Sequence, residues 1–322
     1  MKHLVFSVVS LALVCSGINL FSSCNNNKTL ETFPSDTCHV YNHLTPNENG
    51  VSPLTYGSNN IIGDSVVMQL DTDSSNIYAN FNISILELHP NITADLLSFV
   101  HGQMSGLGLT EGTENSTPCE AKSTNDISQK NFVKSFLDEE SKLFYNNVPS
   151  LLEYGTDFNL GVNIYPVFLN EDFVTYVKYG YSYTGGAHGN VTSFLQSYNL
   201  KTGETVKLED IIESDKYDAL RERIIKHMAS SYPIYENITS VNMYLDSLNS
   251  WLEVGAEPNI QHITLQNYPL HNPGIHQYGL VFSYEKYELT PGYYGCPTIV
   301  LTYDEIRDCL KSSLKNYVTV LN

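Results

Sequence analysis

An alternating run of side chains crosses positions 173–183, near the middle of the 322-residue chain. One face of this run carries Phe173, Thr175, Val177, Tyr179, Tyr181 and Tyr183. A period of two places successive side chains on opposite faces of an extended chain, so the run predicts a β-strand with a ladder of rings on one face. Tyrosine combines an apolar ring with a polar tip, so such a face either packs in a core, the commoner outcome, or stacks on sugars.

A glycine-rich loop follows the ladder and leads into a second strand pattern at 191–200. Its glycines permit positive φ and let a ligand approach the backbone closely. His188, in this loop, either hydrogen-bonds a ligand or stabilises the loop. Catalysis is not indicated, because no obvious nucleophilic residue lies beside His188. The candidate ligand-binding residues are Tyr181, Tyr183, Gly185, Gly186, His188 and Asn190.

The remaining periodicities predict strands and helices interspersed along the chain. Expected strands are 61–70, 77–88, 158–169, 263–266, 278–284 and 297–301, and expected helices are 91–104, 128–147, 241–252 and one capped by Ser214. Lys201-Thr202-Gly203 is predicted to be a turn, and Thr302 with Glu305 forms a capping box at a last helix. Together these patterns predict an α+β fold with antiparallel or mixed sheets.

The N-terminus has the pattern of an export signal. A lysine at position 2 precedes an apolar run at 4–14, which is shorter than the roughly 20 residues of a membrane-spanning helix. Phe21-Ser22-Ser23-Cys24 is similar to the box that precedes the lipid-accepting cysteine of bacterial lipoproteins. We therefore expect a signal peptide at 1–23 and a lipid-anchored tether or irregular arm at 24–60; ordinary cleavage releasing a soluble protein is the alternative.

Charge narrows the class of partner. The net charge is −18, and the arginines are Arg221, Arg223 and Arg307. Nucleic-acid binding needs clustered basic residues, so it is not expected. An acidic body attracts cationic partners through its long-range field, although acidity also serves solubility alone.

Cysteine and histidine spacing predicts disulfides rather than a metal site. With Cys24 lipidated, Cys38, Cys119, Cys296 and Cys309 remain for two bridges. A helix folding back over the strand at 297–301 would join Cys296 to Cys309, which leaves Cys38 for Cys119. His39 and His43 have the HxxxH spacing that places two imidazoles on one face of a helix, but Pro34 and Pro46 flank them in a segment without a helix pattern. The spacings of His262, His271 and His276 match no ligand set, so no metal and no cofactor are expected.

Two ordered motifs resemble the RsiV/PdaC-type domain of bacterial cell-envelope proteins. The first comprises YTGGAHGN at 183–190, YNLKTGE at 198–204 and LEDI at 208–211. The second comprises YGLVFSYEKYELTPGYYG at 278–295 and PTIVLTYDE at 297–305. The resemblance implies a PdaC-like N-terminal half at 60–170 and an RsiV-like C-terminal half at 171–322.

The resemblance also implies an α+β extracytoplasmic domain, which in RsiV-type anti-sigma factors binds lysozyme and in PdaC-type proteins precedes a deacetylase domain. Neither sigma-factor control nor deacetylation is expected here, because the sequence shows neither a sigma-binding region nor a deacetylase domain. The leading hypothesis is a non-catalytic, lipid-anchored envelope protein that binds a peptidoglycan-like glycan or a cationic, lysozyme-like protein. The alternatives are an enzyme acting on cell-wall glycan, with His188 and nearby carboxylates as acid and base, and a purely structural lipoprotein.

Overall fold

The structure is a computed structural model, and it describes residues 61–71, 76–86, 89–105, 135–136, 138–140, 142, 158–184, 188–236, 238–255, 262–312 and 314. Within these ranges the chain divides into two compact units. Unit 1 holds the described residues up to Thr192 together with Tyr198–Glu204, and unit 2 holds Ser193–Ser197 and the described residues from Thr205. The predicted signal peptide, the tether, Cys24, Cys38 and Cys119 lie outside the described residues.

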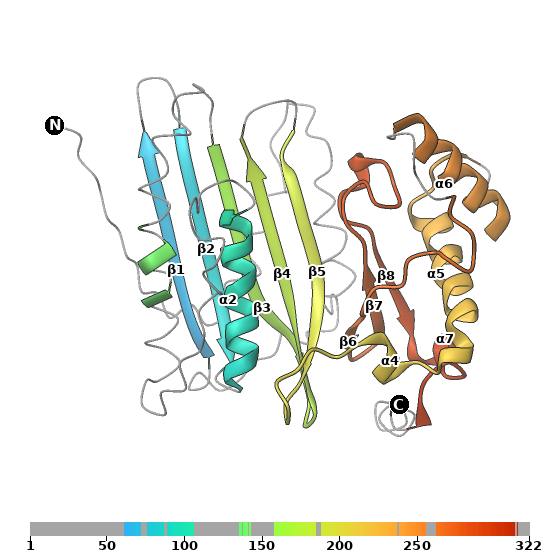
Figure 1. The fold of residues 1–322 in the computed structure, drawn as a ribbon, viewed down its shortest axis with the longest axis horizontal. Coiled ribbons are helices and arrows are strands. Elements are labelled where there is room, and N and C mark those ends of the chain that lie inside the picture. Colours follow the sequence, from blue (N-terminus) through green and yellow to red (C-terminus); the bar gives the residue numbers. More distant parts are fainter. Residues whose placement is uncertain are drawn as a thin grey trace, which may run out of the picture. The chain divides into compact units, whose positions relative to one another are not determined.

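A five-stranded sheet in the order β1-β2-β3-β4-β5 dominates unit 1 (Figure 1). Its strands are β1 (Ile61–Asp71), β2 (Asn76–Leu86), β3 (Phe158–Leu169), β4 (Phe173–Tyr183) and β5 (Asn190–Asn199). β1 pairs antiparallel with β2 and β3 antiparallel with β4, whereas β2 pairs parallel with β3. The middle of β5, Ser193–Ser197, is assigned to unit 2.

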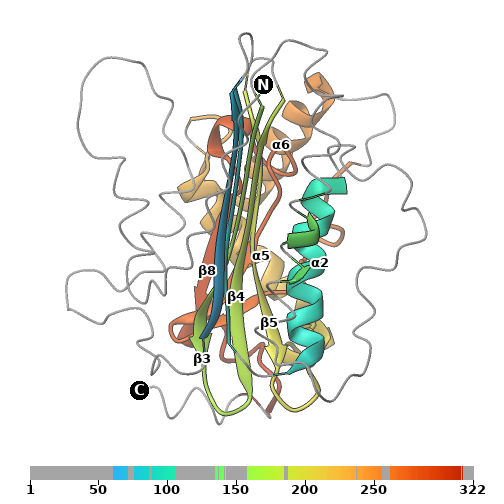
Figure 2. The ribbon, with the colours of Figure 1, turned by 90° about the vertical axis from the view of Figure 1, so that its left-hand side faces the viewer.

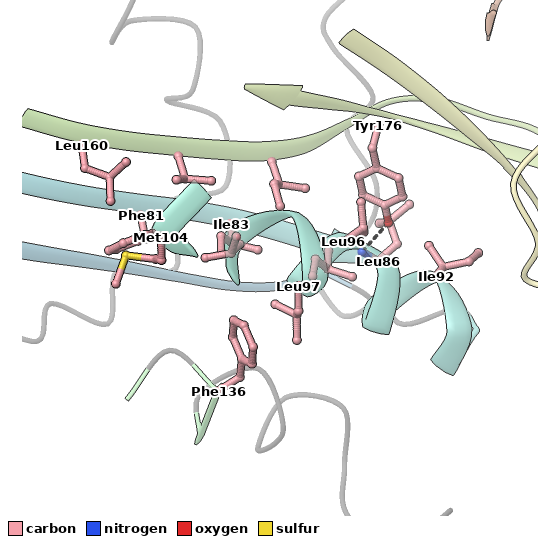
Figure 3. Packing of buried hydrophobic residues seen from close by; sticks show 14 of the residues in the cluster. Phe81, Ile83, Leu86, Ile92, Leu96, Leu97, Met104, Phe136, Leu160 and Tyr176 are labelled. Carbon is pink, nitrogen blue, oxygen red and sulfur yellow. Dashed lines mark hydrogen bonds between the residues drawn. The ribbon is translucent and has the colours of Figure 1, made fainter. Parts of the chain in front are cut away.

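Helix α2 (Pro90–Ser105) covers one face of this sheet (Figure 2). Its buried side chains are Ile92, Leu96, Leu97, Val100 and Met104, a stripe with helical spacing. They pack with residues of the same sheet face such as Phe81, Ile83 and Leu160 (Figure 3). The Tyr176 hydroxyl accepts a hydrogen bond from the backbone N–H of Leu86 at 2.9 Å and so binds β4 to the end of β2. Each fully buried aliphatic side chain of this core stabilises the folded state by about 1.5–3 kcal/mol.

Unit 2 combines a small antiparallel sheet with helices. The sheet has the order β6-β7-β8, formed by β6 (Gly274–His276), β7 (Gly279–Ser283) and β8 (Thr298–Thr302). The other elements are α4 (Leu208–Ile211), η2 (Ser214–Lys216), α5 (Tyr217–Ser231), α6 (Val241–Gly255), η3 (Gly292–Tyr294) and α7 (Tyr303–Ile306). Helix α5 buries Leu220, Ile224, Ile225 and Met228.

The α+β class is confirmed, with mixed and antiparallel sheets. Helix α7 begins at the expected capping box, in which Thr302 Oγ1 accepts from the backbone N–H of Glu305. Lys201-Thr202-Gly203 forms the expected turn: the N–H of Gly203 donates to Asn199 O at 2.8 Å, and Gly203 has a φ of 70°. Of the helix expected at 128–147, the described residues 135–136, 138–140 and 142 are helical.

The strand expected at 263–266 is wrong, because side-chain amides replace strand partners there. Asn249 accepts from the Ile263 N–H at 2.7 Å and donates to the Ile263 carbonyl at 2.8 Å. Asn267 Oδ1 accepts from the Thr264 N–H and closes a turn. The strand that joins this sheet is instead the short β6.

Candidate functional site

The tyrosine ladder of β4 divides into a core part and a partly exposed part. Thr175 and Val177 are fully buried. Tyr179, Tyr181 and Tyr183 are only partly buried. The first part of the ladder therefore packs in a core, and the end nearest the β4–β5 loop is partly accessible; sugar stacking on that end stays a prediction.

The loop after β4 brings one of its glycines against a tyrosine of the ladder. A Cβ atom on Gly189 would lie 2.5–2.7 Å from atoms of the Tyr181 ring, so only glycine leaves room for this ring. His188 and Asn190 are exposed, and His188 Nδ1 lies 3.4 Å from the Gly189 carbonyl oxygen. Gly185 and Gly186 lie outside the described residues, so the prediction that they bind ligand stays a prediction.

Polar side chains of β3 stand beside the exposed end of the ladder. The register pairs Asn159 with Tyr183, Gly161 with Tyr181 and Asn163 with Tyr179. Paired residues point to the same face of a sheet, so amides and phenol rings share this surface. We call Asn159, Asn163, Tyr179, Tyr181 and Tyr183 the Asn–Tyr face.

A gap and a buried amide oxygen adjoin this face. Gly161 pairs with Asn80 of β2 on one side and with Tyr181 on the other. A Cβ on Gly161 would meet only Tyr181 Cβ, at 3.9 Å, so space remains between the two neighbours. Within the described part of the chain, Asn80 Oδ1 is buried and has no hydrogen-bond partner. An unpaired buried carbonyl oxygen costs free energy, so an ordered water is the partner that this oxygen would take.

The residues of β3 and β4 that form the Asn–Tyr face carry no formal charge. Strand β3 contains no acidic or basic residue, and none occurs from Tyr179 to Leu200 apart from the histidine of the loop. The surface therefore offers hydrogen bonds and ring faces without a formal charge. Acid–base catalysis by carboxylates near His188, one of the alternatives above, gains no support from these two strands.

A buried ionic network lies on the opposite face of β4, and the sequence patterns did not indicate it. Lys178 Nζ donates to Asp95 Oδ2 at 2.6 Å, and the Tyr198 hydroxyl donates to the same oxygen at 2.6 Å. The Lys178 side chain is 4% exposed, whereas that of Asp95 is 43% exposed. Burial lowers the pKa of Lys178, and Asp95 opposes this shift. The one signal in the sequence was a lysine among the mainly apolar and aromatic residues of β4.

No bridge joins the two described cysteines, so the structure does not support the expected Cys296–Cys309 disulfide. Their surroundings differ. Arg223 Nη1 donates to Cys309 Sγ at 2.6 Å, which holds this thiol against α5. Burial raises the pKa of Cys296 to about 11 and disfavours its thiolate. The pairing Cys38–Cys119 stays a prediction.

The histidines considered for a metal contact different groups. His271 Nε2 lies 2.6 Å from Glu288 Oε1, and His262 Nε2 lies 3.4 Å from the amide nitrogen of Asn249. His276 is buried against the ring of Tyr278. Among the described residues, no three His, Cys, Asp or Glu side chains are grouped as metal ligands. His39 and His43 lie outside them.

Comparison with known proteins relates the chain to solved structures. No protein-family model and no curated protein sequence matches it. Its fold is similar to that of a DUF3298 family member from Bacteroides fragilis, with a TM-score of 0.51 and 16% identity over 81% of this chain and 96% of that one. A DUF3298 family protein from Pseudomonas aeruginosa is less similar, with a TM-score of 0.43 and 11% identity over 79% of this chain and 95% of that one. At such identities the comparison concerns the fold alone.

Proposed function

We propose that the chain is a non-catalytic binding protein of the bacterial cell envelope and that the Asn–Tyr face binds an uncharged, hydroxyl-rich glycan of the peptidoglycan type. The fold likeness to a DUF3298 protein agrees with the extracytoplasmic domain suggested by the sequence motifs. Lipid attachment at Cys24 is part of the proposal and would anchor the protein to a membrane.

The observation that carries the choice of ligand is the uncharged Asn–Tyr face. Pyranose rings present an apolar face that stacks on tyrosine, and their hydroxyls need both donors and acceptors. Each asparagine side chain supplies both, and the exposed His188 and Asn190 extend the polar surface.

A cationic, lysozyme-like protein is the second candidate, and the net charge of −18 favours it. An acidic body accelerates encounter with a basic partner, and this effect weakens as salt rises. Because β3 and residues 179–200 have no acidic side chain, such a partner would have to bind elsewhere on the surface. The two candidates therefore differ in both salt dependence and sensitivity to changes in the Asn–Tyr face.

Calorimetric titration of the purified protein with a muramyl disaccharide, an N-acetylglucosamine tetramer and lysozyme tests the proposal. We expect saccharide binding that changes little between low and high salt and weakens about tenfold in Tyr183→Ala, as expected for loss of one stacked ring. His188→Ala should weaken it less. Tyr278→Ala, which removes an exposed tyrosine of unit 2, is the matched control.

Three results would contradict the proposal. Lysozyme binding that falls steeply with salt, without saccharide binding, would select the protein partner. Saccharide turnover abolished by His188→Ala would select the enzyme. Loss of thermal stability in Tyr183→Ala and His188→Ala, with unchanged binding, would assign the loop a structural role.

A further inference from the structure

The described part of unit 2 exposes tyrosine more than any other large apolar residue. The exposed large apolar side chains are Tyr235, Met243, Tyr278, Tyr287 and Tyr293. Tyr287 and Tyr293 are 47% and 55% exposed, and they belong to one loop between β7 and β8. We call their two rings the Tyr287–Tyr293 surface.

The backbone of this loop holds the Tyr287 ring in place. A Cβ on Gly292 would lie 2.1–2.5 Å from atoms of the Tyr287 ring, so the ring rests on the glycine next to Tyr293. Tyr287 has a φ of 70°, a conformation that is costly for a side chain of this size. Such strain persists where surrounding contacts impose it, and it is frequent at ligand sites.

Glu288 supplies those contacts. Its Oε2 accepts from the Glu285 N–H at 2.8 Å, and its N–H donates to the Glu285 carbonyl at 3.1 Å. Its Oε1 lies 2.6 Å from His271 Nε2. The turn that contains Tyr287 is thus closed at both ends and joined to the segment before β6.

The second ring is supported through its neighbour. The rings of Tyr293 and Tyr294 lie 4.3 Å apart between centroids. Tyr294 in turn donates from its hydroxyl to the Pro233 carbonyl at 2.9 Å and meets the Tyr232 ring edge to face at 5.5 Å. Both exposed rings are therefore positioned before any ligand arrives, which reduces the entropy cost of binding.

From this geometry we infer that the Tyr287–Tyr293 surface of unit 2 is a saccharide-binding site, in addition to the Asn–Tyr face of unit 1. Two half-exposed tyrosines offer about 200 Å² of ring surface. This area suits one or two pyranose rings but is about a quarter of the roughly 800 Å² that each partner contributes to a standard protein interface. Lys286 Nζ lies over the Tyr287 ring, 5.2 Å from its centroid, and adds a positive charge to this surface.

Titration calorimetry with the N-acetylglucosamine tetramer tests this site in the whole protein. We expect two tetramers bound per native chain and one bound in Tyr293→Ala or Tyr287→Asn. Asparagine tolerates the positive φ of position 287, so this variant removes the ring without adding strain. Tyr293→Phe should keep two tetramers, because the ring face and not the hydroxyl makes the contact.

Further variants separate this site from the one in unit 1. Gly292→Ala should weaken binding about tenfold at the Tyr287–Tyr293 surface. This variant keeps Tyr287, but the added methyl group displaces its ring. Tyr278→Ala, 47% exposed in the same unit, should have no effect. If the native chain binds one tetramer, and Tyr183→Ala abolishes this binding while Tyr293→Ala does not change it, the second site is overturned and the first is kept. One tetramer abolished by Tyr293→Ala alone would overturn the first site and support the second, and no binding at all would overturn both.

Discussion

At the scale of single residues, Lys178 is a basic group with a side chain that is only 4% exposed. Its ammonium is enclosed between the rings of Phe99 and Tyr198, whose centroids lie 5.9 and 5.6 Å from Nζ. Asp95 is its counterion and also accepts a hydrogen bond from the Tyr198 hydroxyl. The network therefore attaches α2 to β4 and β5, and it lies on the sheet face opposite the Asn–Tyr face.

Replacing Asp95 should destabilise unit 1, because a buried ammonium would lose its charged acceptor. Breaking a buried pair costs about 3–5 kcal/mol, and we expect about 2–3 kcal/mol for Asp95→Asn since Asp95 is partly exposed. Urea unfolding checks this value. The double variant Asp95→Asn/Lys178→Met should recover part of the loss, whereas an additive result would show that the ion pair is not the cause.

At the scale of elements, the β7–β8 loop depends on the pair of His271 and Glu288. Glu288 raises the pKa of His271 above its ordinary value of 6.5, with a smaller contribution from Glu285. Tyr284, whose ring centroid lies 5.2 Å from that of His271, packs against the same imidazole. The protonated imidazole therefore stabilises the turn that presents Tyr287.

This pair predicts a pH dependence of stability with a definite sign. A group whose pKa is raised on folding contributes stability that is complete below its unfolded value and is lost as pH rises through the folded value. The native protein should therefore have a higher melting temperature than His271→Asn. This difference should be largest at about pH 5.5 and should decrease towards pH 8.5. Glu288→Gln should reduce the same pH dependence. A difference that is constant with pH would contradict the pairing.

At the scale of the whole molecule, charge and site are separated along the sequence. The chain is strongly acidic overall, yet β3 and the region from β4 to β5 around the Asn–Tyr face contain long uncharged stretches. Within the described ranges, none of the helices combines the length and apolar character needed to cross a bilayer. The proposal of membrane attachment through Cys24 depends on the N-terminal sequence pattern.

The proposed anchor predicts a change of location. Cys24→Ala should move the protein from the membrane fraction to the soluble fraction, because a diacylated cysteine holds a protein at a membrane through its buried alkyl chains. Cys15→Ala is the matched control and should leave the location unchanged. Membrane association that persists in Cys24→Ala, with an unmodified Cys24 in the native protein by mass spectrometry, would exclude the anchor.

Local patterns were sufficient for many of the elements. The strands at 158–169 and 173–183 have the predicted bounds, because alternation along an extended chain needs no knowledge of distant residues. The apolar stripe of α2 and the capping box of Thr302 and Glu305 were likewise predictable, since both depend on residues within one or two turns. The amino-acid sequence by itself thus determined the α+β class and the position of the glycine loop after the ladder.

Contacts between distant segments decided the rest. Asp95 and Lys178 are 83 residues apart, so no local pattern could pair them. The parallel pairing of β2 with β3 and the burial of only one end of the ladder depend on segments that are distant in the sequence. Residues 263–266 form a turn and not a strand, because the side chain of Asn249, 14 residues before Ile263, hydrogen-bonds the N–H and the carbonyl of Ile263. The exposed rings of Tyr287 and Tyr293 are chemically ordinary tyrosines, and only the fold, through Gly292 and Tyr294, determines that they face solvent in fixed positions.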